Sequence, residues 1–130
     1  MYTEKVIKRF QHPEHAGEMK DANAIGTVGN QACGDIMQLY LKVNDETKVI
    51  EKAGFKTFGC AAAIASTDVA CEMITGMTLD EAAKVTNKQV IAQLGELPPH
   101  KIHCSVLAEE SIEAAIADYN KRQEKVNKKK

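Results

Sequence analysis

The sequence predicts an α+β fold, in which a small antiparallel sheet of two to three strands is covered by four to five helices in a single pair of layers. Two observations predict this class. Apolar and polar residues alternate around residue 40, which is typical of a strand with one buried face. Helix start and stop signals then follow one another from residue 60 to residue 119, so a helical layer is available to cover that face.

The N-terminal part predicts one helix and one loop. Residues 4–10 place their apolar side chains at helical spacing, and Pro13 follows them, so we expect a short helix that docks on the body or forms an arm. Three glycines fall between residues 23 and 34. Because glycine frees the backbone dihedrals, we expect a loop there that can adapt its shape to a ligand.

The sheet is predicted from two neighbouring segments. The first is the alternating run, whose apolar members are Met37, Leu39, Leu41 and Val43. Residues 49–58 are expected to return antiparallel to it, either as one segment or as two short strands broken at Ala53 and Gly54. A sheet this small needs helices on its apolar face to be stable.

Four segments of the second half predict helices. Residues 60–74 are rich in alanine and end at Gly76, Thr78 opens a second helix with a capping box, and a third runs from Asn87 to Gly95. The last and longest helix presents one apolar face, formed by Ala108, Ile112, Ala115, Ile116 and Tyr119. We expect residues 1–120 to form one domain and the basic residues 121–130 to fray.

Composition excludes several classes of function. A net charge of −1, 5% aromatic residues and no tryptophan argue against a nucleic-acid-binding protein. The longest run of small apolar residues, 60–65, is too short to cross a bilayer, so no membrane association is expected. The N-terminus mixes charges early, unlike a secretory signal, and we expect a cytoplasmic protein.

Three of the four cysteines fall where predicted elements begin or end. Cys33 precedes the first strand, Cys60 opens an expected helix, and Cys104 lies where the last helix starts. In a reducing compartment such cysteines serve as metal ligands or reactive thiols more often than as disulfide partners. A helix N-terminus also favours the thiolate, which is the form that binds metal or accepts sulfur.

Two further side chains extend this set of donors. Asp35 stands two residues after Cys33, and His103 is next to Cys104. Three thiolates with one oxygen or nitrogen donor suit either zinc or an iron-sulfur centre. The thiols are 27 and 44 residues apart along the chain, so only the fold can assemble the site. Cys71 is eleven residues into the helix that starts at Cys60, about 16 Å along its axis, and is expected to be a core residue.

Three blocks of the sequence resemble those of a known family. The blocks are Ala32-Cys33-Gly34-Asp35, then Phe55 to Cys60 running on to Ser66, then Leu97-Pro98-Pro99 with His103-Cys104-Ser105 and Leu107-Ala108-Glu109. They are similar to the signature blocks of IscU and of the N-terminal domain of NifU, in the same order and at similar spacing. Residues 21–29 are closer to the NifU side.

The resemblance implies a SufE/NifU-like fold and a scaffold for iron-sulfur cluster assembly that is not an enzyme. It implies a cysteine desulfurase that delivers sulfur as a persulfide, a donor of iron and electrons, and apo-proteins that accept a transient two-iron two-sulfur cluster. Carried over by position, Cys33, Cys60 and Cys104 are ligands, with Cys104 as the persulfide acceptor. Asp35 would keep the cluster labile, and His103 is an alternative ligand.

Several alternatives stay open at this stage. The same donors could hold zinc in a structural domain, or Cys104 could be the nucleophile of a thiol sulfurtransferase. The family segment that docks a DnaK-type chaperone is usually Leu-Pro-Pro-Val-Lys, whereas residues 97–101 have His100 in place of Val, which puts that partner in doubt. The oligomeric state, a homo-oligomer included, is not fixed by the sequence.

Overall fold

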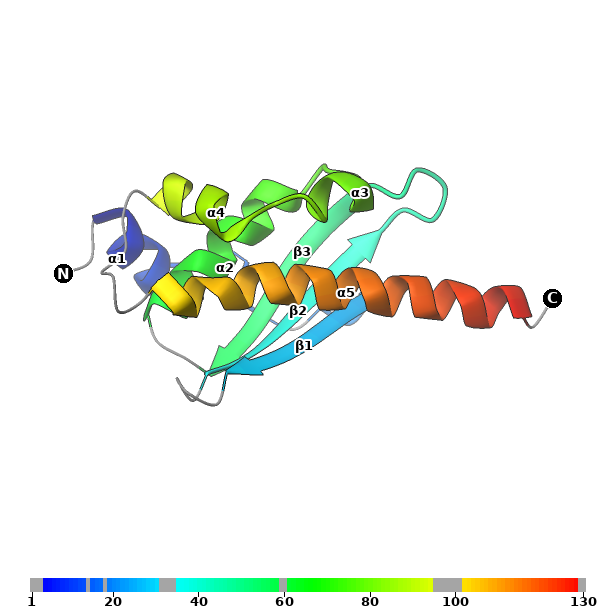
Figure 1. The fold of residues 1–130 in the computed structure, drawn as a ribbon, viewed down its shortest axis with the longest axis horizontal. Coiled ribbons are helices and arrows are strands. Elements are labelled where there is room, and N and C mark those ends of the chain that lie inside the picture. The colour runs from blue at the N-terminus through cyan, green and yellow to red at the C-terminus, as the bar shows by residue number, and fades with distance from the viewer. Residues whose placement is uncertain are drawn as a thin grey trace.

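The computed structural model describes residues 4–13, 15–17, 19–30, 35–58, 61–94 and 102–128. In chain order the elements are α1 (Glu4–Gln11), β1 (Ala24–Asn30), β2 (Asp35–Val43), β3 (Ile50–Phe58), α2 (Ala61–Ile74), α3 (Leu79–Ala82), α4 (Asn87–Leu94) and α5 (Ile102–Lys128). The described elements therefore confirm the expected α+β class, and Figure 1 shows the long helix α5 crossing the sheet.

The three strands form one antiparallel meander in the order β1-β2-β3. Ala24 pairs with Leu41 and Asn30 with Asp35 between β1 and β2, and Ile36 pairs with Phe58 between β2 and β3. The expected returning segment is confirmed and forms the single strand β3, without a break at Ala53 and Gly54. The irregularity lies instead between Lys42 and Val43, where the register shifts.

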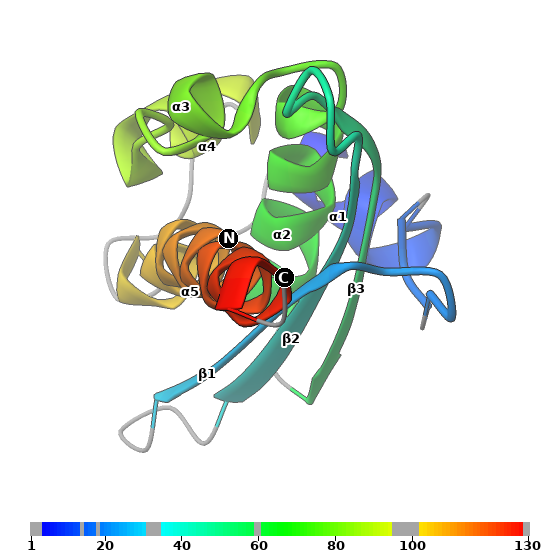
Figure 2. The ribbon, with the colours of Figure 1, turned by 90° about the vertical axis from the view of Figure 1, so that its right-hand side faces the viewer.

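Helices α2 and α5 cover one face of the sheet (Figure 2). The alternating residues of β2 face them, and Met37, Leu39 and Leu41 have no exposed surface. The apolar face predicted for α5 is confirmed, since Ala108, Ile112, Ala115 and Tyr119 are buried. The core is therefore the contact layer between the sheet and these two helices.

The loop expected over residues 23–34 is wrong for most of its length, because Ala24–Asn30 is a strand. The packing around Gly26 explains why a glycine occurs within this strand. A Cβ atom at this position would lie 2.5 Å from the backbone nitrogen of Ala115 and 2.5 Å from the backbone oxygen of Ser111. Glycine is thus required by the close approach of α5, and not by the flexibility of a loop.

The other sheet face is partly covered by the chain that follows α1. The Phe55 amide donates to the His15 carbonyl at 2.9 Å, and the Gly17 amide donates to the Phe55 carbonyl at 2.7 Å, so this segment pairs with the outer edge of β3. Gly54 faces the same segment closely. Tyr40, which pairs with Gly54 across the sheet and alternates with the core residues of β2, is only 5% exposed.

The predicted helix boundaries in the second half are confirmed. Gly76 ends α2 with a φ of +93°, a conformation that favours glycine. Thr78 and Glu81 form both hydrogen bonds of a capping box at the start of α3. Helix α4 ends at Leu94, and residues 95–101 lie outside the described part of the chain.

Helix α5 continues to Lys128 and so includes most of the segment expected to fray, and the fraying itself stays a prediction. Arg122 forms an ion pair with Asp118 one turn earlier, which supports the continuation. The division of the chain at residue 120 stays a prediction. Among the described helices, none combines the length and the hydropathy that a bilayer span requires.

Candidate functional site

One end of the sheet carries two of the chain segments that contain predicted ligands. Asp35 is the first residue of β2 and pairs with Asn30, the last residue of β1, while Ile36 beside it pairs with Phe58, the last residue of β3. Cys33 and Cys60 themselves lie outside the described residues. Their nearest described neighbours on the strand side, Asp35 and Phe58, therefore belong to the same end of the sheet.

The third segment is the first turn of α5, which contains His103 and Cys104. Residues 111–115 of α5 approach Gly26, and Asp118 bonds to Ile25, so the helix runs opposite to β1. The start of α5 accordingly points toward the end of β1. Figure 1 shows the tips of β1 and β3 and the start of α5 on the same, left-hand side of the molecule.

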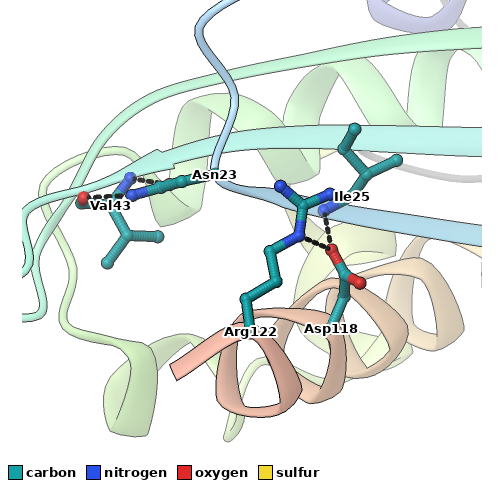
Figure 3. A network of polar contacts seen from close by, with 5 residues as sticks. All are labelled: Asn23, Ile25, Val43, Asp118 and Arg122. Carbon is teal, nitrogen blue, oxygen red and sulfur yellow. Dashed lines mark hydrogen bonds and ion pairs between the residues drawn. The ribbon is translucent and has the colours of Figure 1, made fainter. Parts of the chain in front are cut away.

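Two polar side chains, Asn23 and Asp118, hold the opposite end of β1 in place (Figure 3). The Asp118 carboxylate accepts a hydrogen bond from the Ile25 amide at 2.9 Å and forms an ion pair with Arg122 Nε at 2.9 Å. The Asn23 side chain donates to the Val43 carbonyl at 2.8 Å and accepts from the Val43 amide at 2.7 Å. The Asp118 contact ties α5 to β1, and the Asn23 contacts tie the start of β1 to β2.

Asn23 and Asp118 were not identified as important from the sequence. Asn23 falls in the predicted loop of residues 23–34, and Asp118 is one of several acidic residues in the last predicted helix. The sequence gives one weak indication for Asp118, which is its position directly before the apolar Tyr119. Their role depends on which backbone amides lie opposite them, which the sequence does not encode locally.

His15 has a structural role, because it forms hydrogen bonds to two other segments. The His15 amide donates to the carboxylate of Asp68 at 2.8 Å, and its ring nitrogen Nδ1 lies 3.2 Å from the Ala53 carbonyl oxygen. Asp68 has no exposed surface. His15 and Asp68 together therefore tie the N-terminal segment to α2.

Cys71 is confirmed as a core residue rather than a ligand. Its thiol is free and completely buried in α2. Burial, and to a smaller extent the nearby Asp68 carboxylate, raise the pKa of the Cys71 thiol far above its usual range. The neutral thiol is neither a nucleophile nor a metal ligand.

The predicted ligand set itself stays a prediction. The described residues contain no group of three or more His, Cys, Asp and Glu side chains that could hold a metal ion. Cys33 and Cys60 are not among those residues, and for Asp35, His103 and Cys104 the structure describes the backbone position only. What it provides is the placement of the elements that carry them.

Known proteins match this chain over nearly its whole length. The family model of the NifU-like N terminal domain matches residues 1–126. The iron-sulfur cluster assembly scaffold protein IscU of Escherichia coli K12 is 50% identical over 126 residues, which covers 95% of this chain and 97% of that protein. IscU 1 of Archaeoglobus fulgidus is 48% identical over 128 residues and covers 98% of this chain and 82% of that protein.

A longer protein and a solved structure match as well. The nitrogen fixation protein NifU of Azotobacter chroococcum is 50% identical over 118 residues, which are 91% of this chain and 38% of that protein. The solved structure of the N-terminal part of a NifU-like protein from Brucella abortus superposes with a TM-score of 0.71 at 19% identity, over 92% of this chain and 94% of that one, and so supports the fold alone. From its matched domain and its relatives, this chain belongs to the NifU-like N terminal domain family.

Proposed function

We propose that this protein is a scaffold on which an iron-sulfur cluster is assembled and then passed to other proteins. The observation that carries the proposal is the 50% identity to IscU of Escherichia coli, a protein named for this role, over nearly all of both chains. A scaffold releases what it has assembled and catalyses no reaction of a small substrate, so the cluster is its cargo.

Cys33, Cys60 and Cys104 hold the cluster in this proposal. Asp35 and Phe58 lie at one end of the sheet, and consecutive Cα atoms are about 3.8 Å apart. The covalent chain therefore keeps each of Cys33 and Cys60, two residues away, within about 7.6 Å of these neighbours. The first turn of α5 brings Cys104 toward the same end, which supports a single shared site.

Cys104 accepts sulfur from a cysteine desulfurase in the proposed sequence of events. Its thiolate attacks the terminal sulfur of the persulfide on the desulfurase, so that a new S–S bond forms and the desulfurase cysteine leaves as a thiolate. The position of Cys104 in the first turn of α5 favours the thiolate through the helix dipole. Because this chemistry needs free thiols, we place it in the cytoplasm, a reducing compartment.

The cargo in this proposal is a two-iron two-sulfur cluster, with Asp35 or His103 as the fourth ligand. A carboxylate is a harder ligand than a thiolate, so Asp35 would weaken the hold on the cluster and allow its transfer. Zinc fits the same donors and would occupy the site when iron and sulfide are absent.

His100 in the segment 97–101 argues against a DnaK-type chaperone as a partner.

Anaerobic reconstitution tests the proposal with a matched set of cysteine variants. The protein is incubated with ferrous iron, cysteine, a desulfurase and a thiol reductant that supplies the electrons for reducing persulfide sulfur to sulfide. The visible absorption of the cluster is followed before and after adding an apo-ferredoxin. We expect Cys33→Ser, Cys60→Ser and Cys104→Ser each to abolish a stable chromophore. Cys71→Ala removes the fourth thiol without touching the site and is expected to retain it.

Two results would contradict this reading. A wild-type protein that binds zinc but never exchanges it for an iron-sulfur chromophore would favour a zinc-stabilised structural domain. A chromophore that survives in all three site variants and disappears in Cys71→Ala would place the cluster elsewhere.

A further inference from the structure

One side-chain hydrogen bond joins β2 and β3 at the end of the sheet where the proposed ligands lie. The Thr57 hydroxyl donates to the backbone carbonyl of Ile36 at 2.6 Å. Thr57 stands three residues before Cys60, and Ile36 stands three residues after Cys33. The bond therefore ties together the two strand ends that lead to two of the proposed thiolate ligands.

The carbonyl that accepts this bond belongs to the last pair of residues between the two strands. The amide and carbonyl of Phe55 both bond to residues 15–17 at the outer edge of β3, so they point away from β2. Because backbone groups alternate in direction along a strand, those of Phe58 point toward β2, where Phe58 pairs with Ile36. The Ile36 carbonyl therefore faces β3, and the Thr57 hydroxyl reaches it from the neighbouring position of that strand.

This last pair has little packing to hold it closed. The Ile36 side chain is 52% exposed, whereas Met37 and Leu39, the next inward-facing residues of β2, have no exposed surface. The ends of elements open locally at a lower free energy than their centres, because fewer contacts are broken. The hydroxyl bond is thus placed where burial supports the ladder least.

The strand propensity of threonine does not account for the bond. Valine has nearly the same shape and is also favoured in strands, yet it has no hydroxyl. A second threonine of the sheet, Thr27 in β1, contacts the Gln38 side chain at 3.4 Å, which is a weaker interaction. The 2.6 Å distance at Thr57 is at the short end of the range for a hydroxyl donor, which indicates a well-formed bond.

We propose that Thr57 is a positioning residue of the cluster site, whose bond to the Ile36 carbonyl holds the segments of Cys33 and Cys60 at a fixed separation. This inference rests on the proposed function, which gives the two cysteines their role. The Thr57 hydroxyl is engaged with the backbone, so Thr57 acts through the strand ends and is not itself a ligand. Three residues of chain span at most about 11 Å, so movement of either strand end is passed on to its cysteine.

Opening of the last pair should control how long a cluster is held. Thiolates that bind one iron-sulfur cluster must keep a fixed separation, so an open pair loosens at least one of them. The net contribution of one hydrogen bond corresponds to about a fivefold change in an equilibrium constant. Without the hydroxyl, the open state should be about fivefold more populated, and the cluster should be lost faster by the same factor.

The test compares three variants of the full-length protein. Thr57→Val removes the hydroxyl and keeps the shape of the side chain, and Thr57→Ser keeps the hydroxyl. The matched control is Thr75→Val, since the Thr75 hydroxyl donates to the Cys71 carbonyl at 2.7 Å. Thr75 lies fourteen residues beyond Ala61, about 21 Å along the helix axis, and so is remote from the start of α2.

Two measurements read the effect. In the apo-protein, hydrogen exchange of the Phe58 amide, followed by NMR, reports opening of the last pair, and the Gly54 amide of the same strand is the internal reference. After reconstitution, anaerobic addition of a chelator gives the rate of cluster loss. The visible circular dichroism of the cluster reports the geometry of its ligands.

We expect Thr57→Val to assemble the chromophore, to lose it about fivefold faster than the parent and to alter its visible circular dichroism. Its Phe58 amide should exchange about fivefold faster, with the Gly54 amide unchanged. Thr57→Ser should behave like the parent in every measurement. Thr75→Val should lower the midpoint of thermal unfolding by an amount comparable to Thr57→Val, but its rate of cluster loss should stay that of the parent.

Four outcomes would overturn the inference. Unchanged cluster loss in Thr57→Val would show that the bond does not hold the ligands, and equal acceleration in Thr75→Val would assign the effect to overall stability. A Thr57→Ser protein as labile as Thr57→Val would assign the effect to the methyl group. A Thr57→Val protein without helical circular dichroism would assign Thr57 to folding. A parent that assembles no chromophore would instead refute the proposed function, whatever the exchange rate of the Phe58 amide.

Discussion

Gly26→Ala tests the closest approach in the fold. The new Cβ atom would lie 2.5 Å from two backbone atoms of α5, the nitrogen of Ala115 and the oxygen of Ser111. Ordinary contacts of a Cβ atom need roughly 3.4 Å or more, so α5 and β1 must separate by most of an ångström. Backbone atoms cannot rotate out of the way as the end of a side chain can.

The expected cost is about 3 kcal/mol of unfolding free energy, the upper part of the range for overpacking. For a chain of 130 residues the unfolding entropy is about 0.27 kcal/mol/K, so the midpoint of thermal unfolding should fall by about 10 °C. Thermal unfolding followed by circular dichroism measures this shift. Thr27→Ala, at an exposed neighbouring position of the same strand, is the control and should change the midpoint by less than 3 °C.

The same substitution has a consequence for the site. Moving α5 away from β1 also moves the turn that carries Cys104 relative to the sheet end at Asp35, so a reconstituted cluster should be lost faster. A Gly26→Ala protein that unfolds within 3 °C of the parent would refute the close approach of α5 as the reason for glycine in β1.

Four further results are expected. Asp118→Ala leaves the Ile25 amide without its acceptor and should lower the unfolding free energy in urea by about 1–2 kcal/mol; an unchanged midpoint would mean that water replaces the carboxylate. Burial raises the pKa of the Tyr119 phenol, so the folded state keeps a proton that the unfolded state loses, and stability should fall as pH rises above about 10. Tyr119→Phe should remove that part of the alkaline fall, and an identical fall in this variant would assign it to other groups. Cys71, buried with a raised pKa, should stay unlabelled by iodoacetamide at pH 8 until urea is added, as read by mass spectrometry; labelling of the native protein would show local opening of α2. Asp35→Ala should give a cluster that persists longer and transfers more slowly to an apo-ferredoxin, and faster loss would contradict a labilising role for this carboxylate.

Local patterns determined much of the secondary structure. The alternation of Met37, Leu39 and Leu41 identified β2, and the capping box at Thr78 identified the start of α3. Gly76 marked the end of α2. These predictions succeeded because each depends on hydrogen bonds and side-chain periodicity within a few residues of chain.

The error in the predicted loop falls where distant segments meet. Glycines in β1 indicated a loop, but Gly26 serves the packing of α5, a helix about ninety residues later in the sequence. The deciding partner is therefore remote in the sequence.

The sequence by itself predicted the α+β class and the family, which the structure and the comparisons confirm, because periodicity and signature blocks are local properties of the chain. The set of donor residues that it predicts stays a prediction. Only the tertiary structure decided that the end of β1, the start of β2, the end of β3 and the first turn of α5 lie toward one end of the molecule. The tertiary structure also shows that Cys71 is fully buried in the core. The physical reason is that register and helix docking are set by contacts between segments that no short pattern contains.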